Sequence, residues 1–379
     1  MQAWQIAGVG AASLAAAVLV VATQRWHGRW TSDFQDSGVQ KHHSGNPPRI
    51  GFVPIFIGLL TALYFLAGGT AAGDAATYTL LLNIGLASSP IVLLGLVEDV
   101  TKKVSPRLRL FGALAAGAVA MFLFDNHITR ANVPGLDQML QWAPVALALT
   151  MLMVGGFTNA MNIVDGLNGL ASGLAVLMLA ATAFVASTVG DTVVLNLCAV
   201  LAMAILGFMA LNFPRGLMFL GDGGAYFIGF ALVQVWLLLL ARNPEVSTWF
   251  VVALAFLPTM ETIFSMYRRR IHRGRGGQFT QADRLHLHTL VYRRRMLGLL
   301  SRHAWMEKWM PNAVASVAVL ALGAAPMLAA CLAPTSTAWC VGVLLAAAAG
   351  YLLWFRHMVM FGRVFGRAPA ARANTLAQA

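Results

Sequence analysis

The chain has 379 residues, of which 59% are hydrophobic and only 11% are charged, and its mean hydropathy is +0.71. This composition excludes an ordinary soluble globular domain and predicts a polytopic membrane protein. The formal net charge of +12 at pH 7 either sets the orientation of the chain in the membrane or binds anionic lipid headgroups or a nucleotide.

Eleven apolar segments are long enough to cross a bilayer, which takes about 20 helical residues. The first has no basic residues ahead of it and no evident cleavage site, so we interpret it as a retained span and not as a removed signal. The sequence therefore predicts an all-α membrane protein with about eleven transmembrane helices. The segments are 4–22, 50–66, 78–97, 108–124, 142–157, 170–188, 192–211, 224–240, 249–266, 313–332 and 337–353.

The basic residues between these segments predict the orientation of the chain. Only Arg130 and Arg242 fall on the outer side if the N-terminus is outside. The positive-inside rule then predicts an outer N-terminus and a basic cytoplasmic tail, 354–379, at the C-terminus. The inner loops in this arrangement are 23–49, 98–107, 158–169, 212–223 and 267–311.

The first inner loop contains the stretch QKHHSGNPPRIG, in which Lys41 and His43 precede two prolines and Arg49. Arg49 lies where the second span begins. Alone, such a stretch is typical of a solvated basic cluster beside a membrane. Its significance therefore depends on what the other inner loops contain.

The second inner loop begins with two adjacent carboxylates, Glu98 and Asp99, followed by Lys102 and Lys103. Neighbouring acids repel unless a cation lies near them, so the pair favours Mg²⁺ binding or a protonated member that serves as acid or base. The alternative is a helix C-terminus that runs into a charged turn.

The third inner loop reads NAMNIVDGLNGLASG, and Asn159, Asn162 and Asp165 recur in it every three residues. If the preceding helix continues, the three side chains project from roughly one side. A carboxylate costs about 2.5–3.5 kcal/mol at a bilayer centre, so Asp165 either lies in the interface or binds something. A polar loop between two helices is the alternative.

The fourth inner loop places Asp222 in the sequence GDGG, directly before an apolar run. Glycine allows a phosphate or a metal ion to approach the backbone, and the free N–H groups at a helix start favour anions. A turn followed by an N-cap would give the same pattern.

The fifth inner loop carries His286 and His288 in ADRLHLHTL, after Asp283 and among nine arginines between positions 268 and 295. The planar guanidinium group suits phosphate oxygens, so this loop is a candidate diphosphate site. A transition-metal site lacks a third nearby ligand. Glu261, inside the ninth segment, is either functional or neutralised by a partner, and the sequence does not decide between these.

The predicted topology brings the polar residues of all five loops to one side of the membrane. Carboxylates suit a divalent cation, and arginine and histidine suit phosphates, so the set predicts phosphoryl transfer on a nucleotide substrate at a membrane surface. A transporter would place its polar residues near the midplane and often shows inverted repeats, which are not evident here. The residues are Glu98, Asp99, Asn162, Asp165, Asp222, Asp283, His286 and His288.

Over about residues 41–288, the five stretches resemble, in order, the motifs of the polyprenyl-phosphate N-acetylhexosamine-1-phosphate transferases, bacterial glycosyltransferase family 4. Its members include the enzymes that begin O-antigen synthesis and the MurNAc-pentapeptide translocase. QKHHSGNPPRIG resembles the Lys-x-His…PRxGG motif, GLVEDVTKKVSPRLRL the acidic pair with a lysine, NAMNIVDGLNGLASG the NxxNxxDGxxGLA motif, FLGDGGAYFIGF the GDxGSxxxGF motif and ADRLHLHTL the DRxHLHHxL motif.

The resemblance implies a reaction and its partners. Undecaprenyl phosphate would attack the β-phosphorus of a UDP-N-acetylhexosamine, with GlcNAc as the leading sugar, and release UMP. The step would begin O-antigen or other cell-envelope polysaccharide synthesis at the cytoplasmic face of the bacterial inner membrane. UDP-MurNAc-pentapeptide is the alternative donor. Membrane lipids are expected partners, nucleic acid is not, and a homodimer stays open.

The resemblance also implies roles for individual residues in a single transferase domain, 1–379, whose active site is formed by the inner loops. Mg²⁺, with Mn²⁺ as an alternative, would be held by Asp222 and Asn162. The implied catalytic residues are Asp99, Glu98, Lys102 and Asp165. The implied substrate-binding residues are Lys41, His43, Arg49, Asn159, Asn168, Asp283, His286 and His288.

Five positions depart from the family pattern. Glu98 replaces the first aspartate of the acidic pair, Asn168 the second acidic residue of its motif, Thr289 the last histidine of HLHH, Phe52 the second glycine of PRxGG, and Glu261 an aspartate. Glutamate keeps the charge but moves it by one methylene, so we expect Asp99 to matter more than Glu98. The missing third histidine argues against the MurNAc-pentapeptide branch.

Overall fold

A computed structural model of the chain describes residues 1–32, 46–69, 72–273, 286–296, 307 and 309–361. Helices make up the regular structure of this part, with one isolated bridge between Ser32 and Pro48. They are α1 (Ala3–Ala22), α2 (Gln24–Thr31), α3 (Phe52–Ala67), α4 (Ala72–Thr101), α5 (Pro106–Phe124), α6 (Leu136–Met139), α7 (Ala143–Val164), α8 (Leu170–Thr188), α9 (Thr192–Asn212), α10 (Gly221–Arg242), α11 (Thr248–Leu254), α12 (Phe256–Arg273), α13 (Leu287–Val291), η1 (Tyr292–Met296), α15 (Met310–Cys331) and α16 (Thr337–Phe361).

The described helices fit a multi-pass membrane protein. By length and composition nine of them can cross a membrane, or ten if α11 and α12 together form one broken span. The sequence predicted about eleven spans. The predicted segment 50–66 accounts for the difference between eleven and ten spans. It coincides with α3, which has only 16 residues and is shorter than the helices counted as spans. The outer N-terminus and the cytoplasmic C-terminus stay predictions.

One predicted span, 249–266, is not a straight helix. The chain bends by 72° between α11 and α12. Pro258 lies in the first turn of α12, and it has no N–H to donate to the carbonyl of Leu254, the last residue of α11. An apolar run predicts a span by its composition, but the missing hydrogen bond breaks the helix.

Helices extend into every predicted inner loop. Glu98 and Asp99 lie in the last turns of α4, and α10 begins at Gly221. Asn159 and Asn162 are still helical in α7, so the condition set for their spacing of three is met, and Asp165 is the C-cap. Helices end at caps and breakers rather than where hydrophobicity ends, so the loops are shorter than their predicted bounds. The predicted tail is likewise helical as far as residue 361.

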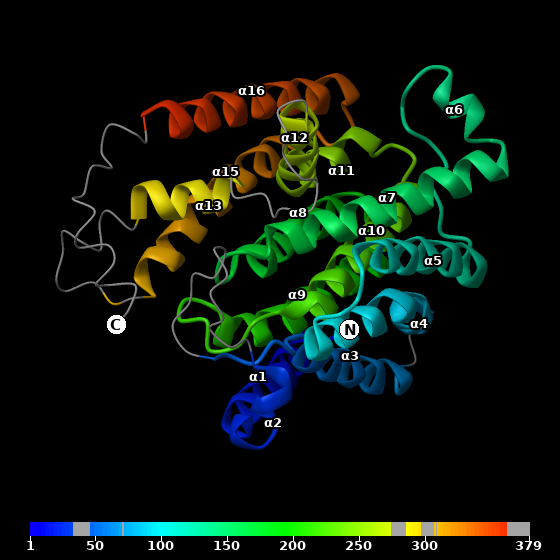
Figure 1. Cartoon of the computed structure of the whole chain (residues 1–379). Coiled ribbons are helices and arrows are strands. Elements are labelled where there is room, and N and C mark those ends of the chain that lie inside the picture. The colour runs from blue at the N-terminus through cyan, green and yellow to red at the C-terminus, as the bar shows by residue number, and fades with distance from the viewer. Residues whose placement is uncertain (33–45, 70–71, 274–285, 297–306, 308, 362–379) are drawn as a thin grey trace.

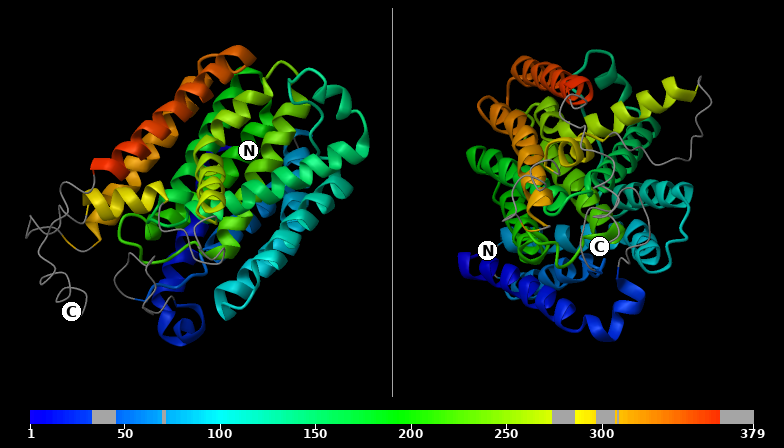
Figure 2. Two further views of the ribbon diagram at one scale, coloured as in Figure 1. Left: turned by 45° about the horizontal axis from the view of Figure 1, so that its top comes forward. Right: turned by 60° about the vertical axis from the view of Figure 1, so that its left-hand side comes forward.

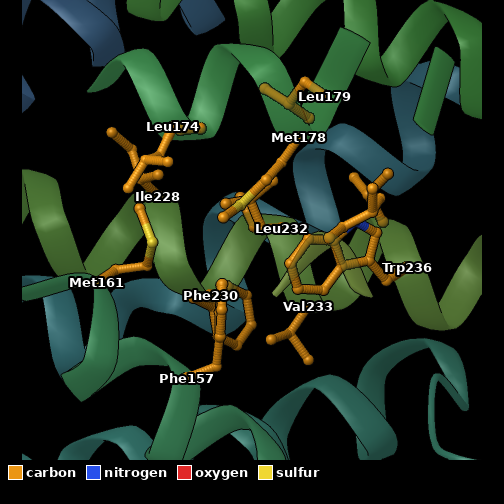
Figure 3. Packing of buried hydrophobic residues seen from close by; sticks show 14 of the residues in the cluster. Phe157, Met161, Leu174, Met178, Leu179, Ile228, Phe230, Leu232, Val233 and Trp236 are labelled. Atoms are coloured by element: carbon orange, nitrogen blue, oxygen red, sulfur yellow. The ribbon is translucent and has the colours of Figure 1, made fainter. Parts of the chain in front are cut away.

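α10 forms the centre of the bundle (Figure 1). Every residue from Gly221 to Leu240 is buried, and α3, α4, α5, α7, α8 and α9 pack around this helix. A helix that is apolar on all sides meets water only at its ends. Figure 3 shows buried side chains of α7 and α8 beside those of α10. The labelled residues are Phe157 and Met161 of α7, Leu174, Met178 and Leu179 of α8, and Ile228, Phe230, Leu232, Val233 and Trp236 of α10.

A close helix contact joins α4 to the start of α10. A β-carbon on Gly95 would lie 2.6 Å from the nitrogen and the α-carbon of Gly223, so only glycine allows this approach. The end of α4 is thereby fixed beside the start of α10. On another side of the bundle α15 and α16 pack against each other and against α11 (Figure 2), and α15 also packs against α8.

Candidate active site

Two buried carboxylates meet where α4 ends and α10 begins. Asp99 of α4 accepts hydrogen bonds from the backbone N–H groups of Asp222, at 2.8 Å, and Gly223, at 2.9 Å. These N–H groups lie in the first turn of α10, where the helix dipole favours negative charge. Asp99 therefore caps α10 and fixes the backbone from which the Asp222 side chain projects.

Two arginines neutralise this pair. Arg49 places Nη2 3.2 Å from Oδ1 of Asp222 and 3.6 Å from Oδ1 of Asp99. Arg109, in the first turn of α5, donates from Nη1 to Oδ2 of Asp222 at 2.6 Å. The Asp222 side chain is 10% exposed, whereas those of Arg49 and Arg109 are 27% and 21% exposed. The guanidinium groups thus lie between the buried acids and the surface, where they can also meet phosphate oxygens.

Backbone pairing holds Arg49 in place. Its N–H donates to the carbonyl of Thr31 at 2.8 Å, and the N–H of Phe219 donates to the carbonyl of Pro48 at 2.9 Å. The N–H of Gly51 completes the arrangement with the carbonyl of Phe219 at 3.0 Å. The PPR stretch of the first inner loop therefore lies against the chain just before GDGG.

Glu98 lies beside Asp99 in the sequence but does a different job. Its Oε2 accepts the N–H of Val104 at 2.7 Å, and its carbonyl accepts the N–H of Lys102 at 2.8 Å. Lys102 has a φ of 55° and is exposed at this turn. Glu98 closes the turn from α4 to α5, so the two carboxylates are not interchangeable.

Asp165 belongs to the same site. Burial raises its pKa to about 7; the charge of Arg49 opposes this rise and that of Asp222 adds to it. Asp165 therefore lies within electrostatic range of Arg49 and Asp222. Asn162, one turn earlier on α7, is half-buried, whereas Asn159 donates from Nδ2 to the carbonyl of Gly155 in its own helix at 2.7 Å.

Asn168 braces two turns of the chain. Its N–H donates to Oδ1 of Asn312 at 2.8 Å, and its Nδ2 donates to the carbonyl of Pro214 at 3.0 Å. The next N–H, of Gly169, donates to Oδ1 of Asn212 at 2.7 Å. These buried amides tie the turn after α7 to the turn after α9. Contact of Asn168 with a nucleotide stays a prediction, since its amide already has a structural use.

The histidines of ADRLHLHTL adjoin the Asp165 turn. The rings of His286 and His288 stack, with centroids 5.5 Å apart and planes at 5°. The His288 ring lies so close to Gly166 that Nε2 would overlap a β-carbon there. Glycine at this position lets the histidine segment pack directly on the residue after Asp165.

Glu261 orients the histidine segment. This side chain of α12 is 1% exposed and accepts the N–H of Leu287 at 3.0 Å and the hydroxyl of Tyr351 at 2.9 Å. Nδ1 of His286 lies 3.0 Å from its Oε2. Buried carboxylates need such partners. Glu261 therefore has partners in a histidine, a backbone N–H and a tyrosine of α16, and a functional role for it stays a prediction.

Two residues of this arrangement, Arg109 and Tyr351, were not predicted from the sequence. Arg109 followed the acidic pair but carried no motif position of its own, and Tyr351 lies within the last apolar segment. A polar hydroxyl inside an apolar helix was the available signal for Tyr351. Lys41, His43 and Asp283 lie outside the described residues.

A magnesium ion at the start of α10 stays a prediction. In the part of the chain that the structure describes, no three His, Cys, Asp or Glu side chains form a metal cluster. Mg²⁺ does not require one, because it is commonly held by one or two carboxylates together with substrate phosphates and water. The carboxylate of Asp222 and the amide oxygen of Asn162 are hard donors of the kind that this ion takes.

Comparison with known proteins gives matches over this region. Residues 81–240, from α4 to α10, match the model of glycosyl transferase family 4. A probable undecaprenyl-phosphate N-acetylglucosaminyl 1-phosphate transferase of Bacillus subtilis (strain 168) is 27% identical over 287 residues, 76% of each chain. The undecaprenyl-phosphate alpha-N-acetylglucosaminyl 1-phosphate transferase of Escherichia coli (strain K12) is 27% identical over 295 residues, 74% of each chain. A phospho-N-acetylmuramoyl-pentapeptide-transferase of Geobacillus thermodenitrificans (strain NG80-2) is 29% identical over 220 residues, 55% of this chain and 66% of that one.

Proposed function

We propose that the chain, whose residues 81–240 match the model of glycosyl transferase family 4, acts as a member of that family: it transfers an N-acetylhexosamine 1-phosphate from a UDP-sugar to undecaprenyl phosphate and releases UMP. GlcNAc 1-phosphate is the leading group, because two of the relatives described above are named for it. The relatives indicate a phospho-sugar transferase that works with a membrane lipid. We propose three further points: the donor is a UDP-sugar, a divalent metal ion takes part, and the step belongs to O-antigen or other envelope polysaccharide synthesis.

One observation carries this proposal. Two buried carboxylates, Asp99 and Asp222, meet two partly exposed arginines at the start of a central membrane helix. Such a grouping of acids and guanidinium groups suits a substrate that brings both a divalent cation and phosphate oxygens. A diphosphate at a membrane surface is such a substrate.

The reaction makes and breaks bonds at one phosphorus. A lipid phosphate oxygen bonds to the β-phosphorus of the UDP-sugar, and the bond from that phosphorus to the bridging oxygen breaks. UMP leaves with the bridging oxygen and its electron pair, so a proton is neither needed nor released in the balance between phosphate anions. The protein has mainly to align the two phosphates and to neutralise their repulsion.

The residues of the site divide this work. Arg49 and Arg109 would donate to the phosphate oxygens, and Asp99 would hold Asp222 in position through its two backbone hydrogen bonds. Asp222 and Asn162 would hold Mg²⁺, or Mn²⁺, whose charge stabilises the departing phosphate. Lys102 stays a proposed contact for the lipid phosphate.

The sugar nucleotide would lie along the turn after α7. Asp165 and the histidines meet there, at Gly166, and Glu261 keeps His286 in one orientation. A histidine N–H is suited to the sugar or to the diphosphate. We also propose that this end of the bundle faces the cytoplasm of a bacterial inner membrane, which the distribution of basic residues favours.

The test is a panel of donors. Purified protein in detergent, with undecaprenyl phosphate and Mg²⁺, is offered UDP-GlcNAc, UDP-GalNAc, UDP-glucose and UDP-MurNAc-pentapeptide, and UMP release is measured beside lipid product. We expect UMP and lipid-linked sugar in equal amounts from an N-acetylhexosamine donor. No UMP from any donor would overturn the proposal.

The same panel tests the second candidate. The pentapeptide-transferase relative is as similar in identity as the others but covers less of the chain. Turnover with UDP-MurNAc-pentapeptide alone would move the protein to peptidoglycan synthesis.

A further inference from the structure

The short helix α2 presents two tryptophan–arginine pairs to the outside. Trp26 and Trp30 are 65% and 52% exposed, and no residue of α2 is buried. The guanidinium carbon of Arg25 lies 4.8 Å from the ring centroid of Trp26, and that of Arg29 lies 3.7 Å from Trp30. The two tryptophans are four residues apart, so both pairs point from the same side of the helix.

The position of α2 places this side at a membrane surface. α2 begins directly after α1, which is long and apolar enough to span a bilayer. Tryptophan is enriched at the level of the lipid headgroups, because its ring is apolar and its N–H is polar. The helix sequence, QRWHGRWT, has two arginines and no acid, and basic residues at this level are attracted to anionic lipids.

Hydrogen bonds join α2 to the active site. The carbonyl of Thr31, the last residue of α2, accepts the N–H of Arg49 at 2.8 Å. Gln24, the first residue, donates from Nε2 to Oγ of Ser32 at 3.1 Å, and Ser32 pairs with Pro48. Residues 46–51, which place Arg49 beside Asp222, are therefore held by both ends of α2. We call these residues the Arg49 segment.

We propose that α2 is a docking surface for the headgroups of anionic phospholipids, and that the bound lipid fixes the Arg49 segment at the active site. The occupant is a phospholipid of the bilayer surface. Charge complementarity and the position at the end of α1 argue for it. The binding claim stands by itself, and its effect on turnover rests on the proposed function.

Lipid binding can be measured without turnover. The purified full-length protein is titrated with phosphatidylglycerol or phosphatidylcholine, and bound lipids are counted by native mass spectrometry. We expect tighter binding of phosphatidylglycerol, and about a tenfold loss of that preference when Arg25→Gln and Arg29→Gln are combined. Arg356→Gln, which removes an exposed arginine of α16, is the control and keeps the preference.

A second double variant tests the tryptophans separately from the arginine charges. Trp26→Ala with Trp30→Ala leaves both arginines in place and should weaken phosphatidylglycerol binding several-fold. If either double variant binds phosphatidylglycerol as the wild type does, the docking surface lies elsewhere. If undecaprenyl phosphate binds at α2 more tightly than phosphatidylglycerol and displaces it, the surface serves the acceptor and the proposal is wrong.

The coupling to the site is tested in nanodiscs of phosphatidylcholine with rising fractions of phosphatidylglycerol. Turnover of the wild type and of Arg356→Gln should rise about threefold, whereas the arginine double variant stays level. A parallel rise in all three would overturn the coupling. Should no protein show any turnover, the proposed function has failed and the binding result is unaffected.

Discussion

The two ends of α10 both gather charged side chains, but they pair them differently. At the start, Asp222 faces two arginines and is held by a second acid, Asp99, so four charged groups share one small volume. We call this the site end. At the other end Asp191 accepts a hydrogen bond from Nε of Arg242 at 2.8 Å, and among the described residues no second acid joins that pair.

At the opposite end of α10, Asp191 and Arg130 have hydrogen-bond partners within the protein. Asp191 also accepts Nδ2 of Asn243 at 3.0 Å and the N–H of Val194 at 3.2 Å. Burial alone would raise the pKa of Asp191, but the hydrogen bonds from Arg242, Asn243 and Val194 hold it below its usual value. Arg130 likewise donates to three carbonyls there, those of Leu240, Asn243 and Val246.

The pKa values of the acids separate the two ends. That of Asp191 is lowered, whereas that of Asp165 at the site end is raised to about 7. A lowered value means that the fold stabilises the charged acid, and a raised value means that it does not. Acids kept in an unfavourable place are typical of binding and catalytic sites, where a cation or substrate relieves them.

The largest expected effect comes from one aspartate at each end. Asp222→Asn should lower the rate of sugar-1-phosphate transfer by at least about 100-fold, because it removes the charge that faces both arginines. Asp191→Asn should leave the rate per folded molecule within about twofold, since it only loosens a cap. UMP release by both variants measures this, and equal losses would end the distinction between the two regions.

The acidic pair gives the next comparison. Asp99→Asn should cost about 100-fold, because an amide replaces one of two acceptor oxygens by a donor that faces a backbone N–H. Glu98→Gln keeps an oxygen for the N–H of Val104 and should cost less than about fivefold. Initial rates at saturating donor and lipid decide between them. A larger loss in Glu98→Gln would show that the assignment of the two is reversed.

Glu261 should have an intermediate effect. Glu261→Ala leaves His286 and a buried N–H without their acceptor, which costs about 1–3 kcal/mol, or about 5–150-fold in kcat/KM. Tyr351→Phe removes one donor of several and should cost at most about fivefold. Partial rescue by Glu261→Gln, with KM for the donor changed more than kcat, would mark a positioning role. A uniform loss of folded protein without a change in KM would contradict it.

The smallest effect is one of stability. The pKa of Asp191 is lowered by folding, so its carboxylate stabilises the fold above the ordinary aspartate pKa, about 3.9, and this contribution is lost as pH falls through the lower folded value. Arg242 is 43% exposed, so most of the gain should come from the cap, about 1 kcal/mol. The melting temperature of Asp191→Asn in detergent should therefore lie below that of the wild type at pH 6–8 and approach it in acid. A constant difference at all pH values would disprove the charge argument.

Much of the site could be predicted because polar residues at the ends of apolar segments are visible in the sequence. Asp222, Asp99 and Asp165 all stood at such ends, and the positive-inside rule placed them together. The spacing of Asn159, Asn162 and Asp165 suited a helix that continues into polar sequence, and α7 does continue as far as Val164. Hydrophobicity and motif order therefore predict which helix ends form the candidate site.

The rest depended on contacts between distant segments. Tyr351 contacts Glu261, 90 residues away in the sequence, and Arg109 contacts Asp222, 113 residues away. Local periodicity in the sequence does not predict either contact. The bend before α12 was missed because composition does not register a single absent hydrogen bond. The hydrogen bonds of Asn168 to Asn312 and Pro214 likewise join distant segments, and its predicted contact with a nucleotide stays a prediction.

The central claim is that substrate binds at the site end of α10 and not at the opposite end. A photoreactive UDP-GlcNAc analogue, irradiated with the purified protein and Mg²⁺ and followed by peptide mapping, tests it most directly. We predict label that unlabelled UDP-GlcNAc displaces, confined to the site end: 46–51, 102–109, 159–169, 214–223 and 286–289. Displaceable label in 125–135, 189–192 or 243–248 would contradict the account.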